Sequence, residues 1–106
     1  MDLGGADMER LREIYLNLTE RILPRRAKEN GWVIVYDHCF QRVILDTVFG
    51  DCWYNYLDKQ ADKPAYKQMS REQLIQAIEV SKKIEQEGQR FIEELNEKSL
   101  EYRGEA

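Results

Sequence analysis

The last third of the chain contains no proline and repeats apolar or small residues at steps of three and four. This spacing places those residues on one face of an α-helix, and Ser70 with Gln73 forms a capping-box pair where the helix would begin. An unbroken helix from Arg71 to Arg103 would be about 50 Å long. A domain of 106 residues is too small to cover such a helix alone. We therefore expect either a bend at Gly88 or a second copy of the chain packed against it.

The apolar face of this helix, which we call the seam, is the predicted interface. Ser81 and Gly88 would let another helix approach closely, and that contact would offset the cost of about 1 kcal/mol that glycine carries in a helix. The opposite face pairs acidic and basic residues four apart, as a solvated face does. We predict self-association as a homodimer, or contact with another protein, through six seam residues: Leu74, Ile78, Ser81, Gly88, Phe91 and Leu95.

The N-terminal part is predicted to be helical as well. Residues 1–6 contain two glycines and little to bury, which favours a flexible lead-in. Asp7 can cap a helix whose apolar residues recur up to Ile22. Pro24 either interrupts this helix or starts a new turn, and Gly31 can close the following helical stretch. Residues 7–106 are thus predicted to form a single helical domain.

The middle of the chain allows two predictions of its secondary structure. Residues 32–36 are rich in β-branched and aromatic side chains and have the propensity of a short strand, but no clear partner strand follows. We favour a helix from about His38 to Phe49, with Asp37 as its N-cap and Gly50 just past its end, over a hairpin. A second short helix capped by Asp51 and a polar loop over residues 58–64 would follow. The expected fold is mainly α, a small three- to four-helix bundle-like domain with a long C-terminal helix.

Composition excludes several classes of protein. Apolar residues make up 42% and charged residues 34%, which suits neither a disordered chain nor a membrane-embedded one. The sequence has no signal-peptide pattern and no apolar run long enough to span a membrane, so we expect a cytoplasmic location. A net charge of −4 argues against nucleic acid or a membrane surface as partner. Cys39 and Cys52 are expected to be free thiols.

Chemistry is concentrated between residues 36 and 57, which hold the single histidine and both cysteines. On a helix, His38, Arg42 and Asp46 would share one face. His38 could act as an acid or base, Arg42 could hold a carboxylate or phosphate, and Asp46 could orient either of them. The simpler interpretation is an intrahelical ion pair of Arg42 with Asp46 that ties this helix to the loop over residues 58–64. Trp53 and Tyr54 lie nearby in sequence and complete a candidate ligand-binding set.

A zinc site is a further alternative. His38, Cys39, Asp46 and Cys52 are suitable ligand types, but neighbouring residues on a helix point apart, so no metal is predicted. The chain has no dinucleotide-binding, phosphate-loop or nucleophile-elbow motif, and no cofactor is predicted either. We therefore favour a non-enzymatic protein that acts through protein contact. Binding or conversion of a small molecule at His38, Arg42 and Asp46 is the alternative.

One stretch of the sequence resembles a known group of proteins. Asp37-His-Cys-Phe-Gln-Arg-Val-Ile-Leu-Asp46, followed by Gly50, Trp53-Tyr54 and Pro64-Ala-Tyr-Lys67, is similar to small bacterial proteins of about this length whose function is uncharacterised. Some of them carry an N-acetyltransferase label, which would imply acetyl-coenzyme A as substrate. Acetyltransferases of the common superfamily have a mixed α/β fold and a glycine-containing pyrophosphate loop. This sequence shows no such loop, and no catalytic residue is carried over.

Overall fold

Helices form most of the protein. The computed structural model describes residues 3–105, and this part of the chain contains no β-strand, which confirms the mainly α prediction. None of its helices is both long and apolar enough to cross a membrane. The elements in chain order are α1 (Met8–Asn17), the π-helical turn η1 (Leu18–Ile22), α2 (Leu23–Asn30), α3 (Asp37–Phe49), the 3-10 turn η2 (Trp53–Asn55), α4 (Ala65–Gln68), α5 (Arg71–Glu87) and α6 (Gln89–Tyr102).

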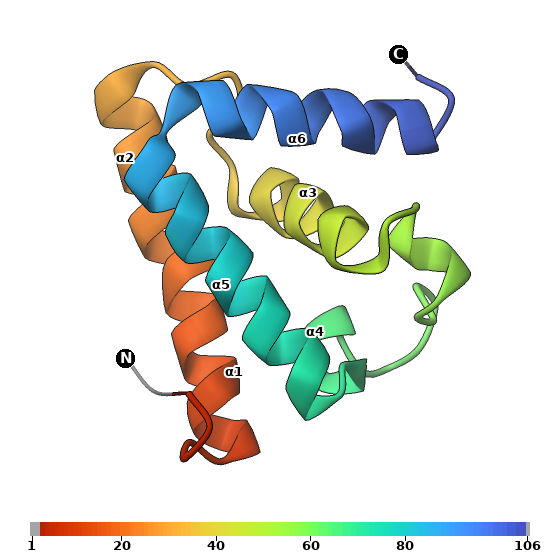
Figure 1. Ribbon diagram of the computed structural model, residues 1–106. Helices are drawn as coiled ribbons and strands as arrows, with labels where there is room; N and C mark the ends of the chain where they lie inside the picture. The colour runs from red at the N-terminus through yellow and green to blue at the C-terminus, as the bar shows by residue number, and fades with distance from the viewer. Residues whose placement is uncertain (1–2, 106) are drawn as a thin grey trace.

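The first three elements follow one another as a single helical column (Figure 1). Asp7 caps the column as predicted, because its Oδ1 accepts the backbone N–H of Arg10 at 2.8 Å. Pro24 does not break the column; it lies in the first turn of α2, directly after the π-helical turn η1. Gly31 closes α2 in the left-handed conformation, with φ of 66°.

Gly88 divides the predicted long helix in two. Its φ of 75° and ψ of −144° lie in a region that only glycine adopts readily. The chain changes direction sharply there, so that α6 crosses the end of α5 instead of extending it (Figure 1). Of the two expectations for this run, the bend at Gly88 is the one observed.

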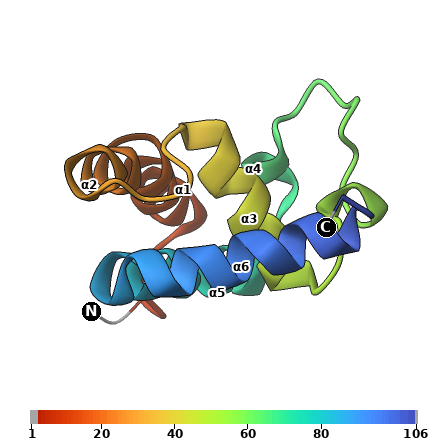
Figure 2. The same ribbon diagram turned by 90° about the horizontal axis from the view of Figure 1, so that it is seen from above.

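Because of this bend, the helices enclose a shared core. The α5 helix packs along α1, while α3 packs against both α5 and α6. Figure 2 shows α3 beside the α1–α2 column, with α6 running next to it. The largest side chains that are fully buried come from all of these helices, and they include Tyr15, Phe40, Ile44, Leu74, Ile78 and Ile92.

The seam therefore faces the chain's own core, and the predicted interface is wrong for most of its residues. Leu74, Ile78 and Ser81 are fully buried, and Leu95 is 8% exposed. Phe91 is half-buried, with the ammonium group of Lys83 lying 4.6 Å from its ring centre. A Cβ atom added at Gly88 would meet the side chain of Trp32 of the same chain. The periodicity correctly predicted that this helix face is buried. The face is covered by α1 and α3 of the same chain, and not by a second copy or another protein.

Order begins before Asp7. Leu3 lies in the hydrophobic core, and the guanidinium group of Arg71 donates to the backbone carbonyls of Leu3 and Gly4 at 3.2 and 2.6 Å. Residues 3 and 4 thus contact the rest of the fold, while the flexible lead-in over residues 1–6 stays a prediction; residues 1 and 2 lie outside the described part of the chain.

The segment from Trp32 to Tyr36 connects α2 to α3 without pairing as a strand. Its first three residues still alternate like a strand, because Trp32 and Ile34 are buried and Val33 is more than half exposed. Tyr36 departs from that alternation, since it is also more than half exposed. The next helix, α3, begins one residue earlier than expected, because Tyr36 and not Asp37 is its N-cap.

Candidate functional site

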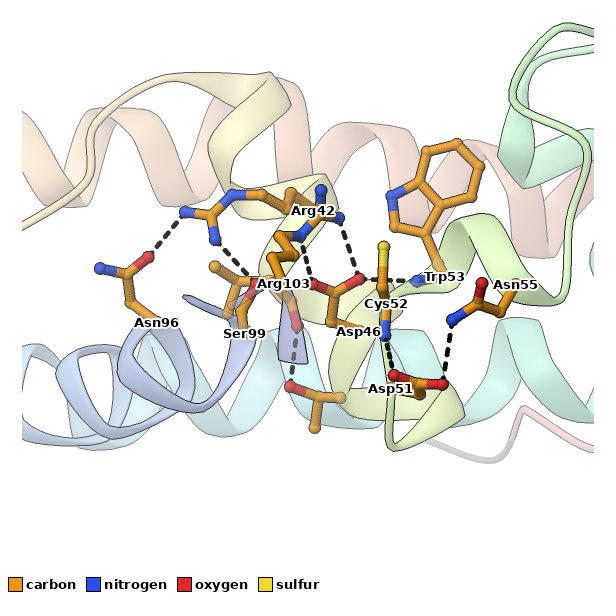
Figure 3. A network of polar contacts seen from close by, with 11 residues as sticks. Arg42, Asp46, Asp51, Cys52, Trp53, Asn55, Asn96, Ser99 and Arg103 are labelled. Atoms are coloured by element: carbon orange, nitrogen blue, oxygen red, sulfur yellow. Dashed lines mark hydrogen bonds and ion pairs between the residues drawn. The ribbon is translucent and has the colours of Figure 1, made fainter. Parts of the chain in front are cut away.

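Asp46 is the centre of a buried polar cluster. Its side chain is fully buried, and its Oδ2 accepts hydrogen bonds from Arg103 Nε at 2.9 Å and from Ser99 Oγ at 2.6 Å. Its Oδ1 accepts the backbone N–H of Trp53 at 2.9 Å and a second bond from Arg103 at 3.2 Å (Figure 3). Four donor groups of three residues, Trp53 after α3 and Ser99 and Arg103 at the end of α6, satisfy this carboxylate. Asp46 is therefore a structural anchor, and not a group that faces a ligand.

Arg42 does not pair with Asp46, so the predicted intrahelical ion pair is wrong. Its two terminal nitrogens donate to Ser99 Oγ at 2.7 Å and to Asn96 Oδ1 at 2.6 Å. The Ser99 hydroxyl accepts from Arg42 and donates to Asp46, so it connects the two charges (Figure 3). These contacts tie α3 to α6, whereas the sequence suggested the loop over residues 58–64.

Arg103, the true ion-pair partner of Asp46, was missed from the sequence. Burial disfavours charge on this guanidinium, but its interactions with Asp46 and Tyr54 outweigh that effect and raise the pKa of Arg103. Its guanidinium carbon lies 4.6 Å from the centre of the Tyr54 ring, and the ammonium group of Lys59 lies 4.4 Å from the same centre. The two cations lower the pKa of Tyr54, with Arg103 as the main cause. No local spacing points to this pairing, because Asp46 and Arg103 are 57 positions apart.

A pocket of about 450 Å³ opens next to this cluster. It is lined by residues of α1 and η1, by α3, and by the segment from Trp53 to Tyr66. Its volume falls in the range of small-molecule sites in proteins, which is about 300–1,000 Å³. Of the predicted ligand-binding residues, His38, Arg42 and Trp53 line the pocket, whereas Asp46 and Tyr54 do not.

The pocket has a polar side close to η1. Gln41 Nε2 donates to Thr19 Oγ1 at 3.2 Å, and the Thr19 hydroxyl donates to the backbone carbonyl of Tyr15 at 3.0 Å. Burial, with a smaller contribution from Glu20, raises the pKa of Tyr15 far above its usual value. Its hydroxyl therefore stays protonated, and it makes no hydrogen bond within residues 3–105. A π-helical turn such as η1 is rare in helices and is found often at functional sites.

His38 lies at the rim of the pocket. Its side chain is 77% exposed, and its ring stacks on Tyr36 with the centres 5.7 Å apart. Its Nδ1 is 3.5 Å from the carboxylate of Asp37, its neighbour in the sequence. His38 can thus touch a bound molecule from outside, but no second acid or base of the predicted set is positioned to work with it.

The alternative zinc site does not assemble. Cys39 and Cys52 are free, half-buried thiols, and Asp46 is occupied by Arg103. Across residues 3–105, no three side chains of the metal-binding types come together as a site.

Comparison with protein-family models, with curated proteins and with solved structures gives no match. The resemblance to an acetyltransferase-labelled group therefore stays a prediction. The mixed α/β fold that this label would imply is not the fold of residues 3–105, which are helical.

Proposed function

We propose that this protein binds a small organic molecule in the pocket between η1, α3 and the segment from Trp53 to Tyr66. The observation that carries the proposal is the pocket itself, which gathers His38, Arg42 and Trp53 around one space of suitable size. This was the alternative function inferred from the sequence. The function favoured from the sequence, protein contact through the seam, has less support, because Leu74, Ile78 and Ser81 are buried in the chain's own core.

The pocket walls are held in place before a ligand arrives. Ser99 and Asn96 fix both terminal nitrogens of Arg42, and the carboxylate of Asp46 holds the backbone N–H of Trp53. Fixing side chains in advance lowers the entropy lost on binding, which favours affinity. The buried cluster therefore supports the pocket, although Asp46 itself does not reach into it.

The test is a fragment screen followed by two-dimensional amide NMR. Ligands that bind should shift the amide signals of pocket-lining residues such as Gln41, Trp53 and Tyr66. Ala65 lines the pocket in α4, so Ala65→Trp should fill the space and abolish these shifts in a folded protein. Glu94→Trp, at an exposed site on α6, is the matched control and should bind as the original protein does. Binding that survives in Ala65→Trp would refute the proposal.

Self-association is the competing function, and a mass measurement separates the two. With the seam buried, we expect light scattering to give the mass of a single chain, with and without ligand. A stable dimer would favour self-association through another surface. We also infer a cytoplasmic location, because Cys39 and Cys52 are both unpaired and such thiols suit a reducing compartment.

A further inference from the structure

We propose that the ligand of this pocket is a small organic anion, a carboxylate carried on a flat apolar body. This inference rests on the proposed function and names its ligand class. Three properties of the pocket carry it: an arginine without a carboxylate partner, an excess of positive charge, and an apolar wall of aromatic and aliphatic side chains.

Arg42 is the first of these properties. It is half-buried, and both of its hydrogen-bond partners, Ser99 and Asn96, are neutral. Within the described chain no carboxylate lies within ion-pair distance of it, in contrast to Arg103, which pairs with Asp46. A guanidinium group has five N–H donors, and the two bonds leave three of them unused. A partly desolvated cation beside an open space favours an anion there.

The charges around the pocket are the second property. Lys59 also lines it, and its ammonium group lies over the ring of Tyr54. No carboxylate of residues 3–105 lies within ion-pair distance of this ammonium group. Among the described residues of the lining, Glu20 is the only carboxylate. With Arg42 and Lys59 opposing Glu20, the lining carries one net positive charge even with His38 neutral. The whole chain, in contrast, carries a net charge of −4, so this pocket is a local positive site on an acidic protein.

The apolar wall is the third property. Trp53 and Tyr66 contribute aromatic side chains, and Leu16, Leu45 and Pro64 contribute aliphatic ones. Such walls bury a flat hydrocarbon ring well, while a bare inorganic anion would leave them in contact with water. The ligand therefore needs an apolar body as well as a charge.

The experiment compares three ligands of one shape and different charge: phenylacetate, phenylacetamide and phenethylamine. Affinities are measured by NMR titration of the full chain at pH 7 and constant ionic strength. We expect the acid to bind at least about tenfold more tightly than the amide, which is the typical gain from hydrogen bonds to a charged group, and the amine to bind most weakly. The advantage of the acid over the amide should shrink as salt is added.

Variants locate the charge recognition. Arg42→Gln and Lys59→Gln should each reduce the preference for acid over amide and leave the affinity for the amide nearly unchanged. Lys63→Gln is the matched control, because Lys63 is exposed in the same loop but does not line the pocket. Lys59 is exposed, so Lys59→Gln stays folded even where Arg42→Gln does not, and it must then show the loss by itself.

The outcomes separate the two proposals. Equal binding of acid and amide, preference for the amine, or an unchanged preference in Lys59→Gln would overturn the anionic ligand class. Each of these results would still be consistent with the pocket being a binding site for a small molecule. A lack of binding by all three compounds, together with a fragment screen that finds no ligand for the pocket, would overturn both.

Discussion

Replacing Asp46 by asparagine tests whether the buried cluster holds the fold together. The substitution keeps the shape of the side chain but turns one oxygen into an NH₂ group. If the remaining oxygen keeps its bond from the backbone of Trp53, the NH₂ group faces the hydroxyl of Ser99 and the Nε of Arg103. The new NH₂ group is a donor, and it then faces the two groups that donated to the oxygen it replaced. The positive charge of Arg103 also loses its only anionic partner in the described chain.

The size of the loss follows from burial. Removing one partner of a buried ion pair costs about 3–5 kcal/mol. The side chain of Asp46 is fully buried, whereas that of Arg103 is 12% exposed and keeps some access to water. We therefore expect a decrease of about 3 kcal/mol in the free energy of unfolding, at the lower end of that range. For a domain of this size, such a loss lowers the Tm by roughly 12–24 °C.

Urea and thermal denaturation followed by far-UV circular dichroism measure this loss, and the dependence on urea should keep its slope. Glu87→Gln is the matched control. It breaks an exposed pair with Lys83 at 3.8 Å, and we expect a change below about 0.5 kcal/mol. Combining Asp46→Asn with Arg103→Leu should recover part of the loss, because no unpaired charge remains. A loss below about 1 kcal/mol for Asp46→Asn, or strict additivity with Arg103→Leu, would refute the reasoning.

Three further predictions concern the backbone at Gly88 and the ionisation of two tyrosines. Gly88→Ala should lower the free energy of unfolding by about 1–3 kcal/mol, because its φ of 75° and ψ of −144° strain any other residue. Gly31→Asn, at an ordinary left-handed position, should cost less in the same urea titration, and an equal cost would contradict the argument. In an ultraviolet titration, Tyr54 should ionise before a typical tyrosine because Arg103 lowers its pKa, and Tyr54→Phe should remove that early phase. Tyr15 should ionise last, because burial raises its pKa in the folded protein. The free energy of unfolding should therefore keep the full contribution of Tyr15 below its unfolded pKa of about 10 and lose it as the pH rises above that value. Early ionisation of Tyr15 in the folded protein would refute its burial.

Local features of the fold could be predicted because they depend on residues close together in sequence. The N-cap at Asp7 and the capping box of Ser70 with Gln73 each involve residues three positions apart. Gly31 and Gly50 close their helices through their own backbone conformation. In each case the chemistry of a few neighbouring side chains decides the outcome, and no knowledge of the tertiary structure is needed.

The candidate site was predicted only in part, because its contacts join distant segments. Helical spacing placed Arg42 and Asp46 together on α3 correctly, yet a spacing of four residues did not decide which partner each would choose. Ser99 and Arg103 of the C-terminal part reach α3 and satisfy both side chains. The pocket escaped prediction for the same reason, since its walls come from residues 15–20, 38–45 and 53–66.

The bend at Gly88 links the fold to the proposed site. Hydrophobic periodicity shows that a helix face is buried, but it does not show which surface covers it. Here the bend lets α3 pack against both α5 and α6, and it also brings Ser99 and Asn96 to Arg42. Had a carboxylate of α6 taken that place, the charge of Arg42 would be neutralised within the chain. Because two neutral acceptors hold it instead, the guanidinium is fixed in position and no carboxylate of residues 3–105 pairs with it. A substitution at Gly88 that shifts α6 should therefore weaken binding of an anionic ligand without touching the pocket wall.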